Sequence, residues 1–173
     1  MKNILLMLLI VNCSFVMAQT DQIYLHNGKT LEVNVKGIAN GVITYSYPQE
    51  KVTMEISEHL VEKIIFTSGR VQQISEKVIV KDINDWENVI ITNIESDIKG
   101  LVRKGEVSET QRGSSASKTH KIQQKAENKM RMKAAEMGAH IIFIKNYNVR
   151  HGDFWWTGQS AKVSVSGIAY GYE

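Results

Sequence analysis

A single segment of this chain has the periodicity of a long amphipathic helix, and the regions around it have the pattern of short strands. Between Lys118 and Met137, apolar side chains recur every four residues among helix-forming neighbours. Gly138 can end this helix in a left-handed conformation, and Ser115 or Ser117 can cap its start. One long helix among strands predicts an α+β fold.

The region before the helix-bearing part reads as short strands separated by turns. Residues 21–80 hold β-prone, partly alternating runs at spacings of about 8–12 residues. Asn27-Gly28 and Asn40-Gly41 are typical of tight turns, and Pro48 ends one of the runs. This pattern predicts a small all-β, barrel-like domain over residues 19–81, because closing the sheet would remove its exposed edges.

A second domain is expected over residues 86–173, after the polar segment 82–85. Residues 89–92 form a continuous apolar run, residues 101–107 suit a second strand, and residues 108–117 are polar and small, as in a loop. After the helix, residues 139–144 read as a buried strand and residues 163–171 as a long alternating one. The prediction is a β-β-α-β-β layer with the helix on one face of a small sheet.

The first 18 residues have the pattern of a secretory signal peptide. Lys2 precedes the apolar run 4–11, and Ala18 offers a small residue at the cleavage point. The alternative is a lipoprotein signal with Cys13 as the lipidated residue, although residues 10–12 lack the small side chains expected there. No other apolar run is long enough to span a membrane, so we expect an exported protein of the periplasm or cell envelope.

Cleavage would leave the mature chain without a thiol, because Cys13 is the one cysteine of the sequence. An intramolecular disulfide, a cysteine-ligated metal and a cysteine nucleophile are then excluded.

Two pieces of the sequence resemble known families. The motif I-x-L-x-x-G-x-x-L from Ile23 to Leu31, with I-x-F-x-x-G from Ile64 to Gly69, resembles a small β domain of exported Bacteroidetes proteins. That resemblance implies no activity.

The second resemblance covers roughly residues 98–172. The stretch KAENKMRMKAAEMGAHIIFI, followed by VSVSGIAYGY, is similar to the family of the RcsF-type envelope-stress sensor and to the YbjQ-type oligomer-forming domains. It implies a layered fold rich in βαβ units and no enzymatic activity. The chain departs from the RcsF type because it lacks the cysteines of that family's disulfides. The matching positions are Ala134, Gly138, Ala139, Gly167, Ala169 and Tyr170.

The sequence contains none of the motifs of hydrolases, zinc proteases, P-loop enzymes or dinucleotide-binding enzymes. His151 with Asp153, joined by His140 if the fold brings it near, is the one arrangement that suggests a metal site or a hydrolase. Ordinary loop histidines are the favoured explanation. We therefore expect no catalytic residue, no metal and no cofactor.

The charge is unevenly distributed along the chain. Residues 19–98 carry 7 basic and 12 acidic side chains (net −5), and residues 99–133 carry 10 basic and 3 acidic ones (net +7). Four lysines at three- and four-residue spacing are expected to share one helix face, where they repel each other. They suggest a docking face for an anionic envelope component or an acidic protein, and a solvated face or a contact with the acidic N-terminal domain is the alternative. These lysines are Lys118, Lys121, Lys125 and Lys129.

Three adjacent aromatic residues form the second candidate site. Phe154, Trp155 and Trp156 lie between Gly152 and Gly158 in a segment expected to be a loop. They can anchor a protein, a sugar or a membrane surface, or fold back over the sheet edge.

The function predicted from these features is a non-catalytic, exported envelope protein that binds or senses a partner. The alternatives are a homo-oligomeric structural domain, as the YbjQ resemblance implies, and a hydrolase built on His151. Nucleic acid is not an expected partner of an exported chain.

Overall fold

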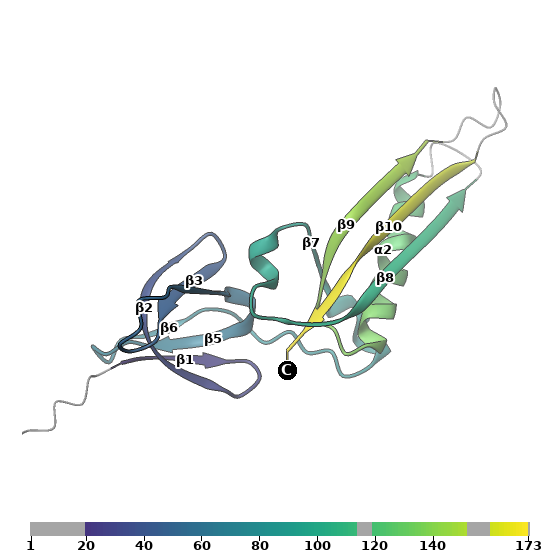
Figure 1. Ribbon diagram of the computed structural model, residues 1–173. Helices are drawn as coiled ribbons and strands as arrows, with labels where there is room; N and C mark the ends of the chain where they lie inside the picture. The colour runs from purple at the N-terminus through teal and green to yellow at the C-terminus, as the bar shows by residue number, and fades with distance from the viewer. Residues whose placement is uncertain (1–19, 114–118, 152–159, 173) are drawn as a thin grey trace, which may run out of the picture.

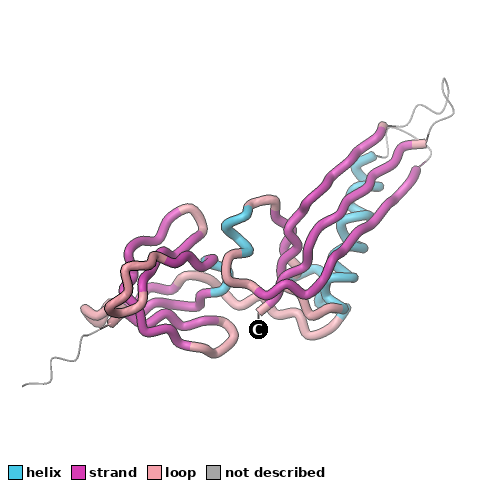
Figure 2. The backbone as a smooth tube through the Cα atoms, viewed as in Figure 1, coloured by secondary structure: helices cyan, strands magenta, loops and turns pink. Residues whose placement is uncertain are grey.

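The chain forms two β-sheets and one long helix (Figures 1 and 2). The computed structural model describes residues 20–113, 119–151 and 160–172. The six-stranded sheet contains only N-terminal strands, and the helix lies against the four-stranded sheet. This confirms the predicted α+β class. Within the described residues, no helix is both long and apolar enough to cross a membrane, and the predicted signal segment lies outside them.

The N-terminal sheet is open, so the predicted barrel-like closure is wrong. Its order is β4-β3-β2-β1-β5-β6, with antiparallel neighbours, which leaves β4 and β6 as edges. Closure is unnecessary because residues of the C-terminal part help to cover its core. The strands are β1 (Asp21–Leu25), β2 (Thr30–Ala39), β3 (Val42–Ser46), β4 (Met54–Ser57), β5 (Val61–Ile65) and β6 (Val71–Gln73).

The C-terminal part has the predicted β-β-α-β-β order. Its sheet runs β7-β9-β10-β8, with β7 parallel to β9 and the other neighbours antiparallel. Short 3₁₀ turns η2 (Ile83–Asn88) and η3 (Glu95–Ile98) flank β7. The elements are β7 (Ile90–Thr92), β8 (Val102–Gly113), α2 (Thr119–Glu136), β9 (Ile141–Arg150) and β10 (Ala161–Gly171).

Two strands reach further than the sequence suggested. Residues 108–113, expected in a loop, form the outer half of β8, and β9 continues to Arg150, well beyond the expected strand 139–144. Both extensions pair with β10 along residues 161–166. Their polar composition suits strands whose one face meets solvent, which is why composition alone indicated a loop.

The apolar stripe of α2 packs on one face of the C-terminal sheet, as predicted. Ile122, Ala126 and Met130 are buried against Val163 and Val165 of β10. The helix lies mainly over β8 and β10. Gly138 follows it with φ +65°, the left-handed conformation expected at the helix end.

The opposite face of the same sheet meets the N-terminal sheet near β7. Ile141 is fully buried and Tyr172 nearly so, and both belong to the core built around Ile23 and Ile64. The Tyr172 hydroxyl also accepts a hydrogen bond from the Val78 backbone N–H at 3.2 Å. Residues of both sheets therefore contribute to this core, which is separate from the core under α2.

A β-bulge in β9 changes which residues face which side. Ser166 pairs with Asn146, but Gly167 pairs with Ile144, so Lys145 is left without a partner in the register. A Cβ atom on Gly167 would lie 2.5 Å from the carbonyl oxygen of Phe143. Only glycine fits this close approach between the two strands.

Candidate functional site

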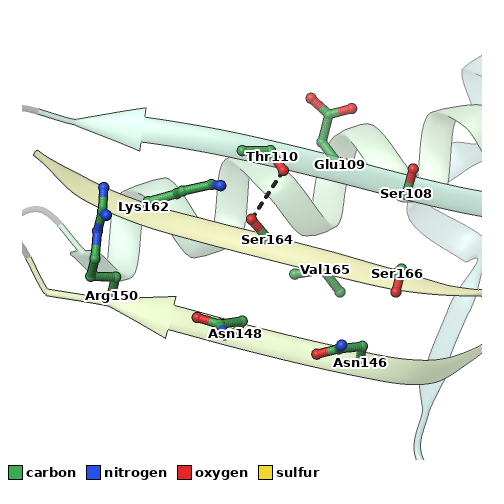
Figure 3. A pocket seen from close by; sticks show the side chains of 10 residues that line it. All are labelled: Ser108, Glu109, Thr110, Asn146, Asn148, Arg150, Lys162, Ser164, Val165 and Ser166. Atoms are coloured by element: carbon green, nitrogen blue, oxygen red, sulfur yellow. Dashed lines mark hydrogen bonds between the residues drawn. The ribbon is translucent and has the colours of Figure 1, made fainter.

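Among the residues that the structure describes, nothing covers one face of the outer half of the C-terminal sheet, and we call this face the polar face. It lies opposite α2, since the intervening residues Val163 and Val165 point into the core under the helix. The view in Figure 3 looks onto this face with the helix behind it. The polar face consists of three cross-strand rows: Asn146, Ser166 and Ser108; Asn148, Ser164 and Thr110; and Arg150, Lys162 and Arg112.

Small polar side chains fill the first two rows, which we call the neutral rows. They border a shallow hollow of about 410 Å³ (Figure 3). Thr110 and Ser164 exchange a hydrogen bond of 3.0 Å between their hydroxyl oxygens. The Asn148 and Asn146 side chains are exposed, and each offers an amide donor pair and a carbonyl acceptor. These rows can therefore donate to and accept from a polar ligand.

The third row, Arg112–Lys162–Arg150, is entirely positive, and we call it the cationic row. Lys162 stands opposite Arg150 on one side and Arg112 on the other. Like charges directly across a sheet are destabilising, so this arrangement weakens the free protein. A bound anion would relieve that repulsion.

Two acidic side chains of β8, Glu109 and Glu106, have partners away from the polar face. Glu109 precedes Thr110 but points to the helix side, where its carboxylate accepts hydrogen bonds from Lys133 at 2.7 Å and Gln111 at 2.6 Å. The bond from Lys133 is the main reason why the pKa of Glu109 lies below its usual value. Glu106, nearer the N-terminal sheet, pairs with Arg103. Within the part of β8, β9 and β10 that the structure describes, no acid stands in the cationic row.

The four lysines predicted as a docking face occupy different environments. Lys121 and Lys125 are exposed on α2. Lys129 lies 3.6 Å from the Glu109 carboxylate, so it takes part in an internal ion pair. Each step of four residues turns about 40° around the helix, which carries the later lysines toward β8. Lys118 lies outside the described residues.

The aromatic candidates Phe154, Trp155 and Trp156 also lie outside the described residues. The chain enters their segment after Arg150 and His151 and returns to the sheet at Ala161. Their role stays a prediction.

The histidines do not gather into a metal site. Within the described residues, no three or more metal-binding side chains lie together. His151 is exposed just after β9, whereas His140 lies before it, stacked on Tyr172 with ring centroids 4.2 Å apart. Asp153 lies outside the described residues.

His140 instead belongs to the contact between the two sheets. Burial, followed by the charges of Lys104 and Lys77, lowers the pKa of His140 to about 4. The Tyr172 ring lies between His140 and His26, whose Nε2 is 2.9 Å from the Ser75 hydroxyl. A neutral imidazole suits this packing.

The sequence analysis did not predict the polar face. The feature that could have revealed it is the alternation of Lys162, Ser164 and Ser166 with buried valines in β10, because this pattern gives the strand one polar side. The strands on either side were assigned to loops in part, so their polar residues were not aligned with β10.

Comparisons with protein-family models, with curated proteins and with solved structures give no match for this chain.

Proposed function

We propose that this chain is a non-catalytic, exported binding module of the cell envelope, and that the polar face is its ligand-binding surface. The observation that carries this proposal is the cationic row at the end of two neutral rows on an uncovered face. Repulsion within that row is unfavourable to folding, and binding of an anionic ligand would relieve this repulsion. Export is supported by the signal-like pattern of residues 1–18.

The experiment compares two basic surfaces of the same protein. The chain from Gln19 to Glu173 is mixed with envelope vesicles from the producing organism and sedimented. Replacing Arg112, Lys162 and Arg150 by Gln is expected to lower the bound fraction about tenfold, because three charge-assisted contacts are lost.

The matched variant carries Lys121→Glu and Lys125→Glu on α2. It retains binding if the polar face is the docking surface. Loss of binding in the helix variant alone would move the site to the predicted lysine face, and equal binding by all three proteins would refute both surfaces.

A homo-oligomer is the second candidate, because one sheet has two long open edges. Within the described part of the chain, the 12-residue strand β8 has a partner on one side only, and β9 pairs with β7 only through residues 141–143. Unpaired edges are templates for strand addition by another copy. Charged residues along β8, including Arg103, Lys104 and Glu106, oppose such pairing.

Light scattering on the same protein at micromolar concentration tests this candidate. A ring or dimer through the β8 edge predicts a multiple of the chain mass that a proline at Ser108 abolishes. A monomer at all concentrations refutes it.

A further inference from the structure

We infer that the ligand of the polar face is a linear acidic glycan, with its carboxylates at the cationic row and its hydroxyls over the neutral rows. This inference rests on the proposed function and names the ligand class of that same surface. It follows from the composition and order of the three rows.

The cationic row fits carboxylates. Arg112 and Arg150 present planar guanidinium groups that bind a carboxylate through two parallel hydrogen bonds, and Lys162 lies between them. The Arg150 guanidinium donates a long hydrogen bond of 3.5 Å to the Ser160 carbonyl oxygen. A guanidinium carries five N–H donors, so this bond leaves it the capacity to bind a carboxylate.

The neutral rows fit hydroxyl groups. The side chains of Asn148, Ser164 and Thr110 can each donate and accept a hydrogen bond, as a sugar hydroxyl does. The Asn146–Ser166–Ser108 row repeats this chemistry one step further from the charges. A simple phosphate or another small anion would use the cationic row and leave both neutral rows without a role.

The dimensions of the face suit a short stretch of polymer. Neighbouring strands lie about 4.8 Å apart, and alternate residues of a strand about 7 Å apart. Three strands and three rows therefore cover about 10 Å by about 14 Å. This is an extended, shallow surface (Figure 3) rather than an enclosed pocket for a small molecule.

Other polyanions match the face less well. Protein interfaces are centred on buried aromatic or aliphatic anchors, and membrane surfaces require apolar residues that enter the lipid. Single-stranded nucleic acid is held by stacking on aromatic rings. None of the nine side chains of the polar face is aromatic or aliphatic.

Affinity electrophoresis in gels containing a polymer tests the inference on the chain from Gln19 to Glu173. Polygalacturonate is the acidic glycan, and highly methyl-esterified pectin is the matched glycan with its charge removed. We expect retardation by polygalacturonate and little by the ester. The Arg112→Gln, Lys162→Gln, Arg150→Gln variant is expected to weaken it at least about tenfold.

A second variant separates glycan recognition from plain charge attraction. Thr110→Val, Ser164→Val and Asn148→Leu keep the net charge and remove one neutral row. We expect about a fivefold to tenfold loss on polygalacturonate, because the hydrogen bonds to hydroxyls disappear. Circular dichroism confirms that the variant is folded.

The charge-matched control replaces Lys36, Lys51 and Lys81, which are exposed and lie outside the strands of the C-terminal sheet, by Gln. It should bind polygalacturonate like the parent protein.

Inorganic polyphosphate and vesicles containing phosphatidylglycerol supply the opposing outcomes. Equal retardation by polyphosphate, with no effect of the neutral-row variant, would show plain charge attraction and overturn the glycan inference. Binding to the vesicles without binding to polygalacturonate would identify a lipid surface instead. If envelope binding depends on the cationic row while polygalacturonate is not bound, the proposed function stands and this inference falls.

Discussion

The two halves of one sheet face meet opposite environments in this protein. Near β7, the face turned away from α2 presents Ile141 and Tyr170, which pack on the core of the N-terminal sheet. Beyond the bulge at Lys145, the same face presents Asn146, Asn148 and their polar neighbours to solvent. The strands are continuous, so the difference arises from the side chains and from what covers them.

The inner half of this face stabilises the fold, and the outer half does not. The inner half holds buried apolar groups whose removal leaves a cavity, whereas the outer half carries repelling charges that folding does not need. A surface that weakens the fold yet stays uncovered is the better candidate for function.

Truncating one side chain in each half of the face tests this division most directly. Ile141→Ala should lower the free energy of unfolding by about 3 kcal/mol, because the residue is fully buried between the sheets. Ser166→Ala in the polar face should change it by less than about 0.5 kcal/mol. Urea unfolding followed by circular dichroism measures both, and similar losses would contradict the division.

The bulge that separates the halves is tested by Gly167→Ala. The added methyl meets the Phe143 carbonyl oxygen, which belongs to the backbone and cannot yield as a flexible side chain does. We expect a loss of about 2 kcal/mol in the free energy of unfolding. Gly37→Ala is the control, since nothing lies within 4 Å of its added Cβ and the loss there should be small.

The contact between the sheets should also depend on pH. The pKa of His140 is about 4 in the folded protein against an ordinary 6.5, so the unfolded chain binds the proton first as the pH falls. The free energy of unfolding should therefore be highest above pH 6.5 and decrease from there toward pH 4. His26, whose pKa burial also lowers, adds a change of the same sign.

Urea midpoints at pH 7.5 and pH 5 measure this effect. His140→Phe removes the titrating group and should reduce the difference, whereas His120→Phe on exposed helix surface should retain it. An undiminished difference in His140→Phe would exclude His140 as the source.

The smallest expected effect is an increase in the free energy of unfolding, whereas the substitutions above lower it. Lys162→Gln removes the central charge of the cationic row and should raise the free energy of unfolding by about 0.2–0.5 kcal/mol at low salt. Lys36→Gln, a matched loss of one charge on the other sheet, controls for net charge. Destabilisation by Lys162→Gln would show that the row supports the fold and would weaken its assignment as a binding surface.

Several features followed from local sequence. The apolar residues Ile122, Ala126 and Met130 recur with the helical period, and Gly138 supplies the left-handed residue that ends the helix. The alternation in residues 163–171 marked β10 correctly. These predictions succeeded because neighbours in the chain determine helical and strand periodicity.

Other features depended on residues far apart in the sequence. Residues 108–113 are polar, and only their pairing with residues 161–166 of β10 makes them a strand. The N-terminal sheet stays open because Leu101, Ile141 and Tyr172 reach its core from the other part of the chain. The cationic row exists only in the register that brings Arg112, Lys162 and Arg150 side by side.

The α+β class, the long helix and the two-sided character of β10 could be predicted from the residues alone, because they depend on local periodicity. Strand partners, the bulge opposite Gly167 and the polar face depend on the folded chain, because register is set by long-range packing. A shift of one residue in β9 would turn Asn148 toward the helix and Tyr147 toward solvent on the polar face. That sensitivity is why the functional surface became visible only in the fold.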